Sequence, residues 1–328
     1  MTATAHETRG AAHVLDIDDL SCEALRRILD LADAAPAALP PVLAGRGVAV
    51  VLELPSARTR NATEMAVVAL GGHPVTIQGT EIGIDRRETA EDVARTLGCF
   101  HAAICARVAD HRTLLRMVAA VDGEGMAVPV LNLLSDRAHP CQALADLLTL
   151  RQHFGELGGQ TVAYVGDANN VWRSLALACA MSGVRLRTAS PEGYGPDPDD
   201  VGVVAGAGGE VEWTTDPMEA VAGADAVYTD VWVSMGQEAE AEQRRQSFSG
   251  FTVDDALLRA AGPGAVVLHC LPAHRGEEIT ASVVDGPRSR VWRQAAHRRT
   301  AMRGILSWLV GHAADGPTVR PWWEGGSR

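Results

Sequence analysis

The sequence lacks several features that would place it in common classes of protein. No apolar run approaches the ~18–20 residues that a helix needs to cross a bilayer. Residues Met1 to Ala12 contain no apolar segment of the kind found in signal peptides, so we expect no export. The glycine fingerprint G-x-G-x-x-G is also missing, which disfavours a nucleotide-dependent α/β enzyme. Together these absences predict a cytoplasmic protein that does not bind a dinucleotide.

Cysteine is sparse, and no two cysteines form a C-x-x-C pair. In a chain of this length without an export signal, free thiols are expected rather than a disulfide framework. No group of His, Cys and Asp residues has the spacing of a metal site, so we expect neither a metal nor an organic cofactor. The six cysteines are Cys22, Cys99, Cys105, Cys141, Cys179 and Cys270.

Positive charge is scarce as well. The chain has 41 acidic and 29 basic residues, and its formal net charge is −12. A nucleic-acid-binding protein needs a basic surface, so this balance argues against that class of partner. An anionic substrate must therefore be captured by a local group of arginines rather than by the overall field of the protein.

The chain is rich in short β-branched runs that alternate with longer stretches of helical periodicity. This alternation predicts βαβ units and parallel sheets. The 328 residues, 47% of them hydrophobic, are enough for about two domains, because single cores stop growing beyond ~250–300 residues. We therefore predict an α/β fold of two doubly wound parallel-sheet domains. The glycine-rich, polar segment Gly155 to Gln160 is the expected junction.

In the first half, Ser21 is the expected N-cap of a helix with apolar residues at helical spacing. Gly71 and Gly72 are expected to end a second helix. Pro129 weakens the third predicted strand, because proline lacks the N–H group that a sheet needs. The expected strands of this half are 48–52, 102–106 and 128–133, and the expected helices that follow the first are 59–70 and 139–154.

In the second half, a helix is expected to begin near Asn170, directly after a strand and the turn Gly166-Asp167. The stretch 202–209 is interpreted as a loop or as the end of a weak helix. The last strong helix is expected over about 294–310. The expected strands are 161–165, 186–189, 226–229 and 265–269.

The first chemical motif is the run Ser56 to Arg60, which reads Ser-Ala-Arg-Thr-Arg. It lies between a hydrophobic strand and a helix, where backbone N–H groups and the helix dipole favour an anion. Ser56 and Thr59 add hydroxyl donors, and Arg58 adds a forked cation suited to phosphate. The alternative interpretation is an N-cap serine followed by solvated arginines.

The second motif, His139-Pro140-Cys141-Gln142, opens a predicted helix. Its histidine and glutamine are three residues apart and therefore share one helical face. The imidazole can donate to a carbonyl oxygen, and the glutamine oxygen can accept from an amide NH₂. The alternative is a histidine that only caps a surface helix.

Two further groups follow predicted strands. Arg107 and Cys270 each lie just past an apolar strand, at the carboxyl end where open α/β sheets place ligands. Leu271 and Pro272 leave the helical region and can present carbonyl groups to a ligand. The alternatives are a solvated arginine and a buried cysteine that acts as a small hydrophobe.

The fourth motif, Asp230 to Gly236, begins at another strand end. A carboxylate there can bind a cationic amine, and Gly236 permits a tight loop that turns Ser234 and Met235 inward. Asn170 can hydrogen-bond a carboxylate or an amino group of a ligand. Gathered in one cleft, the four motifs predict a protein that holds a small acyl phosphate and moves its acyl group.

With these motifs in this order, the chain resembles the transcarbamylase family, and within it the ornithine branch. The family's Ser-Thr-Arg-Thr-Arg appears as Ser56 to Arg60, and its His-Pro-x-Gln as His139 to Gln142. The motif His-Cys-Leu-Pro stands intact at His269 to Pro272. The ornithine-branch motif Asp-x-x-x-Ser-Met-Gly is Asp230 to Gly236. The resemblance runs from about Leu15 to Leu309.

The resemblance implies an enzyme of arginine biosynthesis that transfers the carbamoyl group of carbamoyl phosphate to the δ-amine of L-ornithine, giving L-citrulline and phosphate. Carbamoyl phosphate would be bound by Ser56, Ala57, Arg58, Thr59, Glu81, Arg107, His139, Gln142, Cys270, Leu271 and Arg298. Ornithine would be bound by Asn170, Asp230, Ser234 and Met235. The groups expected to take part in catalysis are Cys270, Asp230, Arg107, His139 and Arg298.

The resemblance also implies an arrangement of domains and subunits. Residues 1–150 would form the carbamoyl phosphate-binding domain, with the helix over about 294–310 packed back onto it. Residues 151–293 would form the ornithine-binding domain, with the active site in the cleft between the two. The family is trimeric, so we expect a homotrimer or a multiple of trimers in which a loop near 78–87 completes a neighbour's site.

The chain departs from the family pattern at a few positions. Ala57 replaces the usual threonine, but its backbone N–H remains. Glu81 stands where many relatives have glutamine, and a carboxylate there would repel a bound phosphate. Ala296 and His297 replace a run that carries an orienting carboxylate before Arg298. These departures favour a competing hypothesis, a non-catalytic paralogue. Two more hypotheses stay open: a carbamoyltransferase for another amine, such as putrescine or an acylated ornithine, and a nucleotide-dependent enzyme.

Overall fold

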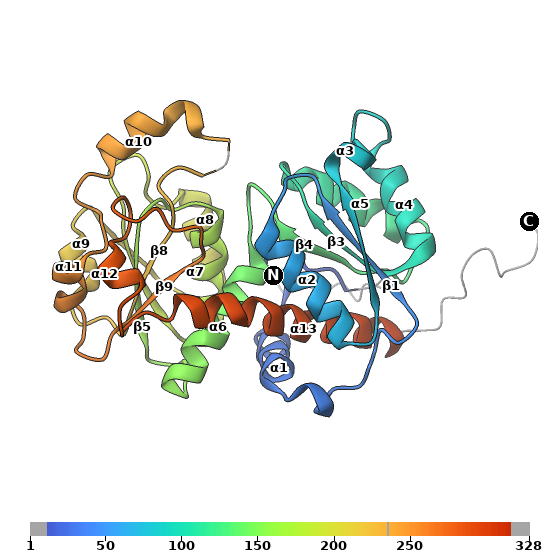
Figure 1. The fold of residues 1–328 in the computed structure, drawn as a ribbon, viewed down its shortest axis with the longest axis horizontal. Coiled ribbons are helices and arrows are strands. Elements are labelled where there is room, and N and C mark those ends of the chain that lie inside the picture. The colour runs from blue at the N-terminus through green and yellow to red at the C-terminus, as the bar shows by residue number, and fades with distance from the viewer. Residues whose placement is uncertain (1–11, 235, 316–328) are drawn as a thin grey trace, which may run out of the picture. The chain divides into compact units, whose positions relative to one another are not determined.

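The computed structural model describes residues 12–234 and 236–315 of the chain (Figure 1). The chain divides into two compact units. Within the described ranges, the first unit contains residues 12–138 and 299–315, and the second contains residues 139–298 apart from position 235. The proposed domain boundary near residue 150 lies inside helix α6 (Pro140–Phe154), which belongs wholly to the second unit.

The first unit is built on a parallel sheet in the order β2-β1-β3-β4. The strands are β1 (Gly47–Leu52), β2 (His73–Gln78), β3 (His101–Arg107) and β4 (Val130–Leu134). The chain leaves β1 toward one edge of the sheet and returns to β3 on the other side of β1. The carboxyl ends of β1 and β3 therefore flank a topological switch point, where open α/β sheets bind ligands.

The helices of the first unit cover both faces of its sheet. Right-handed crossovers place α2 (Ala57–Ala69) on one face and α4 (Ala90–Phe100) and α5 (His111–Gly123) on the other. Ala49 and Val51 alternate along β1 and pack in one fully buried cluster with residues of α4 and α5. The remaining short helices before α4 are η1 (Ile17–Asp19), η2 (Pro36–Ala38) and α3 (Gly79–Ile82).

Helix α1 (Cys22–Asp33) packs against the C-terminal part of α13 (Val291–Asp315) within the first unit. The Arg303 guanidinium donates to the carbonyl oxygen of Ala32 at 2.9 Å. A Cβ atom at Gly304 would lie 2.5 Å from the carbonyl oxygen of Ile28, so only glycine permits this approach of the two helices. The C-terminal helix is thereby held on the first unit by contacts of its residues from 299 onward.

The second unit contains a parallel sheet in the order β7-β6-β5-β8-β9. Its strands are β5 (Thr161–Val165), β6 (Arg185–Ala189), β7 (Val211–Thr214), β8 (Ala226–Thr229) and β9 (Val266–His269). The direction of winding reverses at β5, so the switch point of this sheet lies between the carboxyl ends of β5 and β8. The chain segments that follow β5, β8 and β9 all leave the sheet at this edge.

Helices also cover both faces of the second sheet. One face carries α7 (Asn170–Ser182) and α8 (Pro198–Gly206), with α6 packed against α7. The other face carries α9 (Pro217–Val221) and α11 (Asp255–Ala260), whose apolar residues join alternate strand residues in a buried cluster. The remaining short elements are η3 (Glu238–Glu240), α10 (Ala241–Ser247) and α12 (Ala281–Val284).

The predicted α/β class with two doubly wound parallel sheets is confirmed. Most element bounds are close to the predicted ones, with three physical exceptions. Helix α2 begins at Ala57 rather than residue 59, because Ser56 is its N-cap. Strand β4 begins after Pro129, which has no N–H to donate. Strand β2 was not predicted; it is a half-exposed edge strand that contains Pro74. The stretch 202–209 includes the end of α8.

Within the described ranges, no helix combines the length and apolar character that a membrane crossing requires.

Candidate active site

The N-terminus of α2 lies directly after β1, as the Ser56 to Arg60 motif predicts. The Ser56 hydroxyl accepts a hydrogen bond from the Thr59 N–H at 3.3 Å and so caps the helix. Thr59 is buried, whereas Ala57 and Arg58 are exposed. The helix start therefore offers backbone N–H groups and a cationic side chain at its accessible end, which suits an anion.

Arg107 is the last residue of β3 and lies beside the end of β1. It pairs in register with Leu52, and its carbonyl oxygen accepts a hydrogen bond from the Glu53 N–H at 2.9 Å. Arg107 is only 4% exposed, so its guanidinium carries charge in a poorly solvated position. The two predicted phosphate-binding segments of the first unit thus flank the same switch point.

Glu81 has a local structural role in this structure. Its carboxylate accepts a hydrogen bond from the Gln78 N–H at 2.6 Å, and the two residues form a capping box at the start of α3. The carbonyl oxygen of Glu81 accepts a hydrogen bond from Arg87 at 2.9 Å. The Glu81 carboxylate is therefore engaged in helix capping within its own chain.

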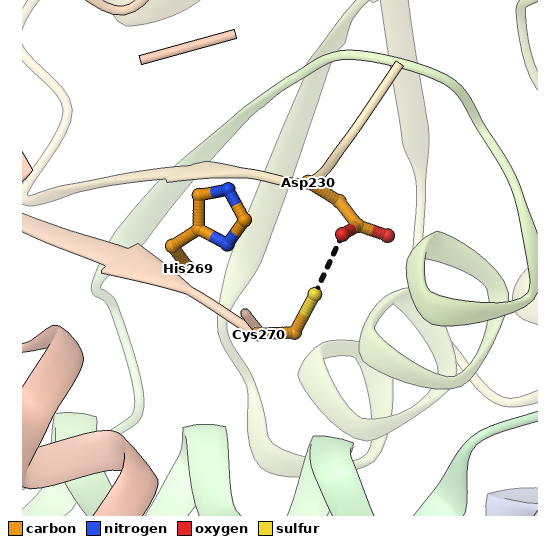
Figure 2. A group of neighbouring side chains, drawn as sticks. All are labelled: Asp230, His269 and Cys270. Carbon is orange, nitrogen blue, oxygen red and sulfur yellow. Dashed lines mark hydrogen bonds between the residues drawn. The ribbon is translucent and has the colours of Figure 1, made fainter. Parts of the chain in front are cut away.

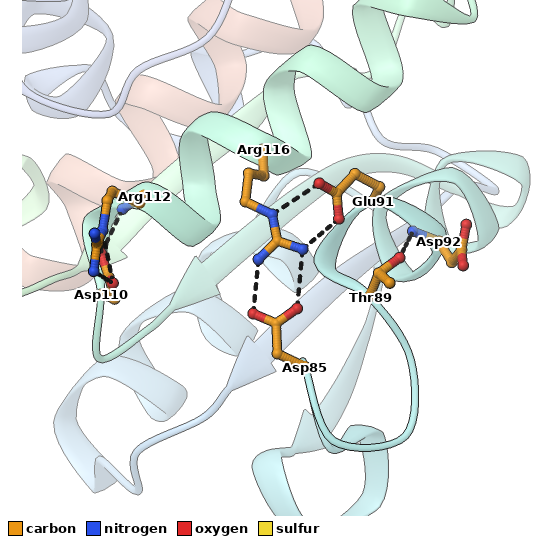
Figure 3. Close-up of polar contacts among 7 residues, drawn as sticks. All are labelled: Asp85, Thr89, Glu91, Asp92, Asp110, Arg112 and Arg116. Carbon is orange, nitrogen blue, oxygen red and sulfur yellow. Dashed lines mark hydrogen bonds and ion pairs between the residues drawn. The ribbon is translucent and has the colours of Figure 1, made fainter.

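The loop that follows α3 is held by an arginine that the sequence did not reveal. Arg116 on α5 donates to both Asp85 carboxylate oxygens at 2.7 and 3.0 Å, and to both Glu91 carboxylate oxygens at 2.8 and 2.5 Å (Figure 3). These hydrogen bonds lower the pKa of Glu91 to about 2. Figure 3 also shows Thr89, whose hydroxyl caps α4 by accepting from the Asp92 N–H at 3.1 Å.

In the second unit, His139 is the N-cap residue of α6, one residue before the helix begins. Its backbone N–H donates to the Ser174 hydroxyl oxygen of α7 at 2.9 Å. Gln142, one turn into α6, is 1% exposed, and its side-chain oxygen accepts a hydrogen bond from Arg298 at 2.5 Å. The structure thus brings together the His-Pro-x-Gln motif and the predicted Arg298. The Gln142 oxygen has two lone pairs, so it can still accept a second hydrogen bond from a ligand.

Asp230 and Cys270 lie side by side because they follow neighbouring strands, β8 and β9 (Figure 2). The Cys270 thiol donates to one Asp230 carboxylate oxygen at 2.7 Å. Burial, together with the charge and the hydrogen bond of Asp230, raises the pKa of Cys270 well above its ordinary value. Cys270 is therefore a neutral thiol that donates to Asp230, not a thiolate.

The Asp230 carboxylate is held from two other directions. The same oxygen accepts from the Val231 N–H at 2.8 Å, and the second oxygen accepts from the Asn169 side-chain amide at 3.1 Å. Asn169 also caps α7 through its side-chain oxygen. The predicted ligand Asn170 is half-buried in the first turn of the same helix. Asn170 stays a predicted ligand, and the sequence analysis missed the hydrogen bond of the neighbouring Asn169 to Asp230.

The residues around Cys270 fix the turn after β9. His269 is fully buried; its Nε2 lies 3.0 Å from a Glu278 oxygen, and its Nδ1 accepts from the Leu271 N–H at 2.9 Å. Because Nδ1 accepts, Nε2 is the ring nitrogen that donates to Glu278. Leu271 has a φ of 62°, a left-handed conformation that is costly for a residue with a side chain.

Among the described residues, two groups of side chains have atoms close enough together to suggest a metal site. Asp230, His269 and Cys270 each place one possible ligand atom within 4.8 Å of the others. Both His269 nitrogens already make hydrogen bonds and the thiol is protonated, so this donor set does not fit a metal ion. The second group is His274, Glu277 and Glu278, of which Glu278 accepts hydrogen bonds from His269 and from the His274 N–H. The absence of a cofactor stays a prediction.

The loop after Asp230 is held by a buried ion pair. Arg244 on α10 donates to Asp167, after β5, at 2.8 Å and to the Trp232 carbonyl oxygen at 3.1 Å. The Ser234 N–H donates to the Gln237 side-chain oxygen at 3.0 Å. Met235 lies outside the described residues. The positions of Arg244 and Asp167, 77 residues apart, gave no local signal of their pairing.

The chain is similar to known proteins along most of its length. The carbamoyl-P binding domain of aspartate/ornithine carbamoyltransferase matches residues 12–152, and the Asp/Orn binding domain matches residues 158–309. The chain is 47% identical over 305 residues to an ornithine carbamoyltransferase of Acidothermus cellulolyticus, covering 91% of this chain and 96% of the relative. It is 46% identical over 299 residues to that of Thermus thermophilus, covering 90% and 96%.

Solved structures show the same likeness. The crystal structure of ornithine carbamoyltransferase from Thermus thermophilus has a TM-score of 0.82 at 42% identity, with 91% of this chain and 99% of that chain covered. The structure of the Pyrococcus furiosus ornithine carbamoyltransferase has a TM-score of 0.86 at 40% identity, with 93% and 98% covered. The chain belongs to the aspartate/ornithine carbamoyltransferase family.

Proposed function

We propose that this protein is an enzyme of arginine biosynthesis that transfers the carbamoyl group of carbamoyl phosphate to the δ-amine of L-ornithine, giving L-citrulline and phosphate. The observation that carries the proposal is the Asp230–Cys270 hydrogen bond of 2.7 Å, next to the loop that contains Ser234. A carboxylate whose oxygens are held by hydrogen bonds is a suitable partner for an alkyl ammonium group. The relatives named ornithine carbamoyltransferase, at 40–47% identity, support the same choice of substrate.

Carbamoyl phosphate is assigned to positively charged and donor groups of both units. In the first unit, Arg58, Thr59, Arg107 and the backbone around Ser56 bind the phosphate and polarise the carbonyl oxygen. In the second unit, the assigned groups are His139, Gln142, Arg298 and the backbone of Cys270 and Leu271. Donors aimed at the developing oxyanion account for much of the expected rate enhancement, and alignment of the two substrates accounts for much of the rest.

Ornithine is assigned to Asp230, Asn170, Ser234 and Met235. Its δ-ammonium has an ordinary pKa near ~10.4 and must lose a proton before it attacks the carbonyl carbon. The raised pKa of the Cys270 thiol argues against a thiolate as the base. Asp230 is therefore the group that binds the ammonium and draws its proton, while Cys270 serves as its hydrogen-bond partner.

We also propose that the protein is a homotrimer in which the 78–87 loop reaches a neighbouring subunit. Glu81 belongs to this loop, but its carboxylate caps α3, so it enters the proposal through its backbone rather than as a phosphate ligand. The cytoplasm remains the proposed location, in keeping with six cysteines that all carry free thiols. Light scattering after size-exclusion chromatography measures the mass of the assembly.

A colorimetric citrulline assay with a panel of amines tests the proposed activity. Purified protein is supplied with carbamoyl phosphate and with L-ornithine, putrescine or N-acetylornithine. We expect carbamoylation of ornithine at a kcat/KM at least 100-fold above that of the other amines. Preference for another amine would redirect the substrate, and absence of turnover with every amine would identify a non-catalytic paralogue.

A further inference from the structure

A buried carboxylate that the proposed mechanism does not use lies one turn beyond Gln142 on α6. Asp146 is 0% exposed. Burying a carboxylate is unfavourable unless hydrogen bonds compensate for the lost water. The contacts of Asp146 are therefore informative about why an acid occupies this position.

One oxygen of Asp146 holds two glutamine side chains. It accepts a hydrogen bond from the Gln142 amide nitrogen at 2.7 Å and from the Gln294 amide nitrogen at 2.7 Å. Gln142 lies on the same helix, whereas Gln294 lies on α13, 148 residues away in sequence. All three side chains are buried and all belong to the second unit.

The side-chain oxygens of the two glutamines contact the proposed binding site for carbamoyl phosphate. One contacts Arg298, which is assigned to that ligand, and the other contacts His269, the neighbour of Cys270. The Gln142 side-chain oxygen accepts a hydrogen bond from the Arg298 guanidinium at 2.5 Å. The Gln294 side-chain oxygen accepts a hydrogen bond from the backbone N–H of His269 at 2.8 Å. A primary amide has one donor end and one acceptor end. A carboxylate that takes both donor ends therefore forces both acceptor ends toward Arg298 and toward the end of β9, next to Cys270.

We propose that Asp146 is a positioning residue for carbamoyl phosphate binding: it fixes the Gln142 and Gln294 amides, and through them the Arg298 side chain and the His269–Cys270 turn. This inference rests on the proposed function, because it names the group that orients the phosphate-binding side of the same site. Asp146 does not touch the substrate in this scheme.

The surroundings of Asp146 support a role as a hydrogen-bond acceptor rather than as a free charge. Burial raises the pKa of Asp146 to about 7. The hydrogen bonds from Gln294, Gln142 and Tyr228 lower this pKa but do not offset the effect of burial. The protonated acid still has one oxygen that accepts both amide N–H groups. Asparagine has the same shape and the same acceptor oxygen, so it should replace the acid. The other titratable groups that interact with Asp146 are Arg298, Tyr164, Cys179 and Cys270.

The test compares four variants of the full-length protein. Asp146→Ala removes the acceptor, and Asp146→Asn keeps it. Gln294→Met removes one arm of the network and serves if Asp146→Ala does not fold. Thr188→Val is the matched control, because it deletes another fully buried hydrogen bond of the second unit, to the Trp172 indole at 2.8 Å. The readouts are the phosphate dissociation constant by calorimetry, the KM values of both substrates, and the Tm.

We expect Asp146→Ala to weaken phosphate binding and raise the KM for carbamoyl phosphate by at least tenfold, with less than a threefold change in the KM for ornithine. Asp146→Asn should stay within threefold of the native protein, and Gln294→Met should weaken phosphate binding by at least threefold. Thr188→Val should lower the Tm without changing either KM. The proposal is overturned if phosphate binding is unchanged in folded Asp146→Ala or in Gln294→Met, if asparagine fails to rescue, or if the control shifts KM as strongly.

The calorimetric arm separates this inference from the proposed function. Phosphate binding is measured without turnover, so it reports on Asp146 even if ornithine is not the acceptor. A native protein that makes no citrulline but binds phosphate in an Asp146-dependent manner would refute the proposed function and leave the positioning role in place. Normal citrulline formation with Asp146-independent phosphate binding would support the proposed function and refute the positioning role.

Discussion

Replacing Asp230 by asparagine keeps the size of the side chain but removes its charge. In the native structure this carboxylate accepts three hydrogen bonds, from the Cys270 thiol at 2.7 Å, the Val231 N–H at 2.8 Å and the Asn169 amide at 3.1 Å. An asparagine oxygen can keep the backbone contact, so the fold should persist. The proposed contact with the ornithine ammonium would lose its charge assistance, which is worth about 1.5–3 kcal/mol.

This free energy corresponds to a rise of about 10- to 150-fold in the KM for ornithine. A second consequence concerns the thiol. The charge and the hydrogen bond of Asp230 both raise the pKa of Cys270, so Asp230→Asn should lower that pKa. Burial also raises the pKa of Cys270, and this effect remains in the variant. More thiolate at a given pH means faster alkylation.

Steady-state kinetics and mass spectrometry measure the two effects on the same preparation. The rate of iodoacetamide labelling at Cys270 is followed against pH, with the exposed Cys22 as the internal reference. An unchanged KM for ornithine would refute the role of Asp230 in amine binding. An unchanged or slower labelling of Cys270, with Cys22 unaffected, would refute the electrostatic coupling of the pair.

Three further predictions follow from other parts of the structure. Arg58→Ala should abolish carbamoyl phosphate binding with an unchanged Tm, as calorimetry and a melting curve would show; near-normal turnover would contradict the assignment. Gly304→Ala should destabilise the first unit by about 1–3 kcal/mol, because the new Cβ meets the Ile28 carbonyl oxygen at 2.5 Å, and denaturant titration measures this loss. The pKa of Asp146 is raised on folding from 3.8 to about 7, so its contribution to stability should be lost progressively as pH rises between these values. Asp146→Asn should remove that part of the pH dependence, and identical stability profiles for the two proteins would disprove it.

Most of the fold was predictable because its signals are local. A strand of consecutive buried residues, such as Val48 to Leu52, is apolar along its whole length, since helices cover both faces of a parallel sheet. Ser21 and Ser56 mark helix starts because each caps the N–H three residues on. The residues after the strands were predictable as a group, because parallel strands bring their carboxyl ends to one edge. Arg107, Asp230 and Cys270 all lie at such ends.

The missed features depend on contacts between distant parts of the sequence. Gln294 meets Asp146 across 148 residues, and Arg244 meets Asp167 across 77. In the sequence, Asp146 has no feature that distinguishes it from an exposed acidic residue of a helix. Only the structure shows that this carboxyl group is buried. The capping role of Glu81 was missed for a different reason. Its partner Gln78 is three residues away, but a capping box at a helix of four residues carries too weak a pattern to outweigh a family comparison.

The hydrogen bonds from Arg116 to Asp85 and Glu91 have a consequence for the proposed assembly of subunits. Because this arginine braces the 84–91 segment from within one chain, the segment acquires its shape before any neighbour arrives. In the proposed trimer, association of subunits would join preformed surfaces and would not have to order a flexible chain at the same moment, which favours tight contact. Strong salt, by weakening exposed ion pairs of this kind, should loosen the 84–91 segment before it unfolds either sheet.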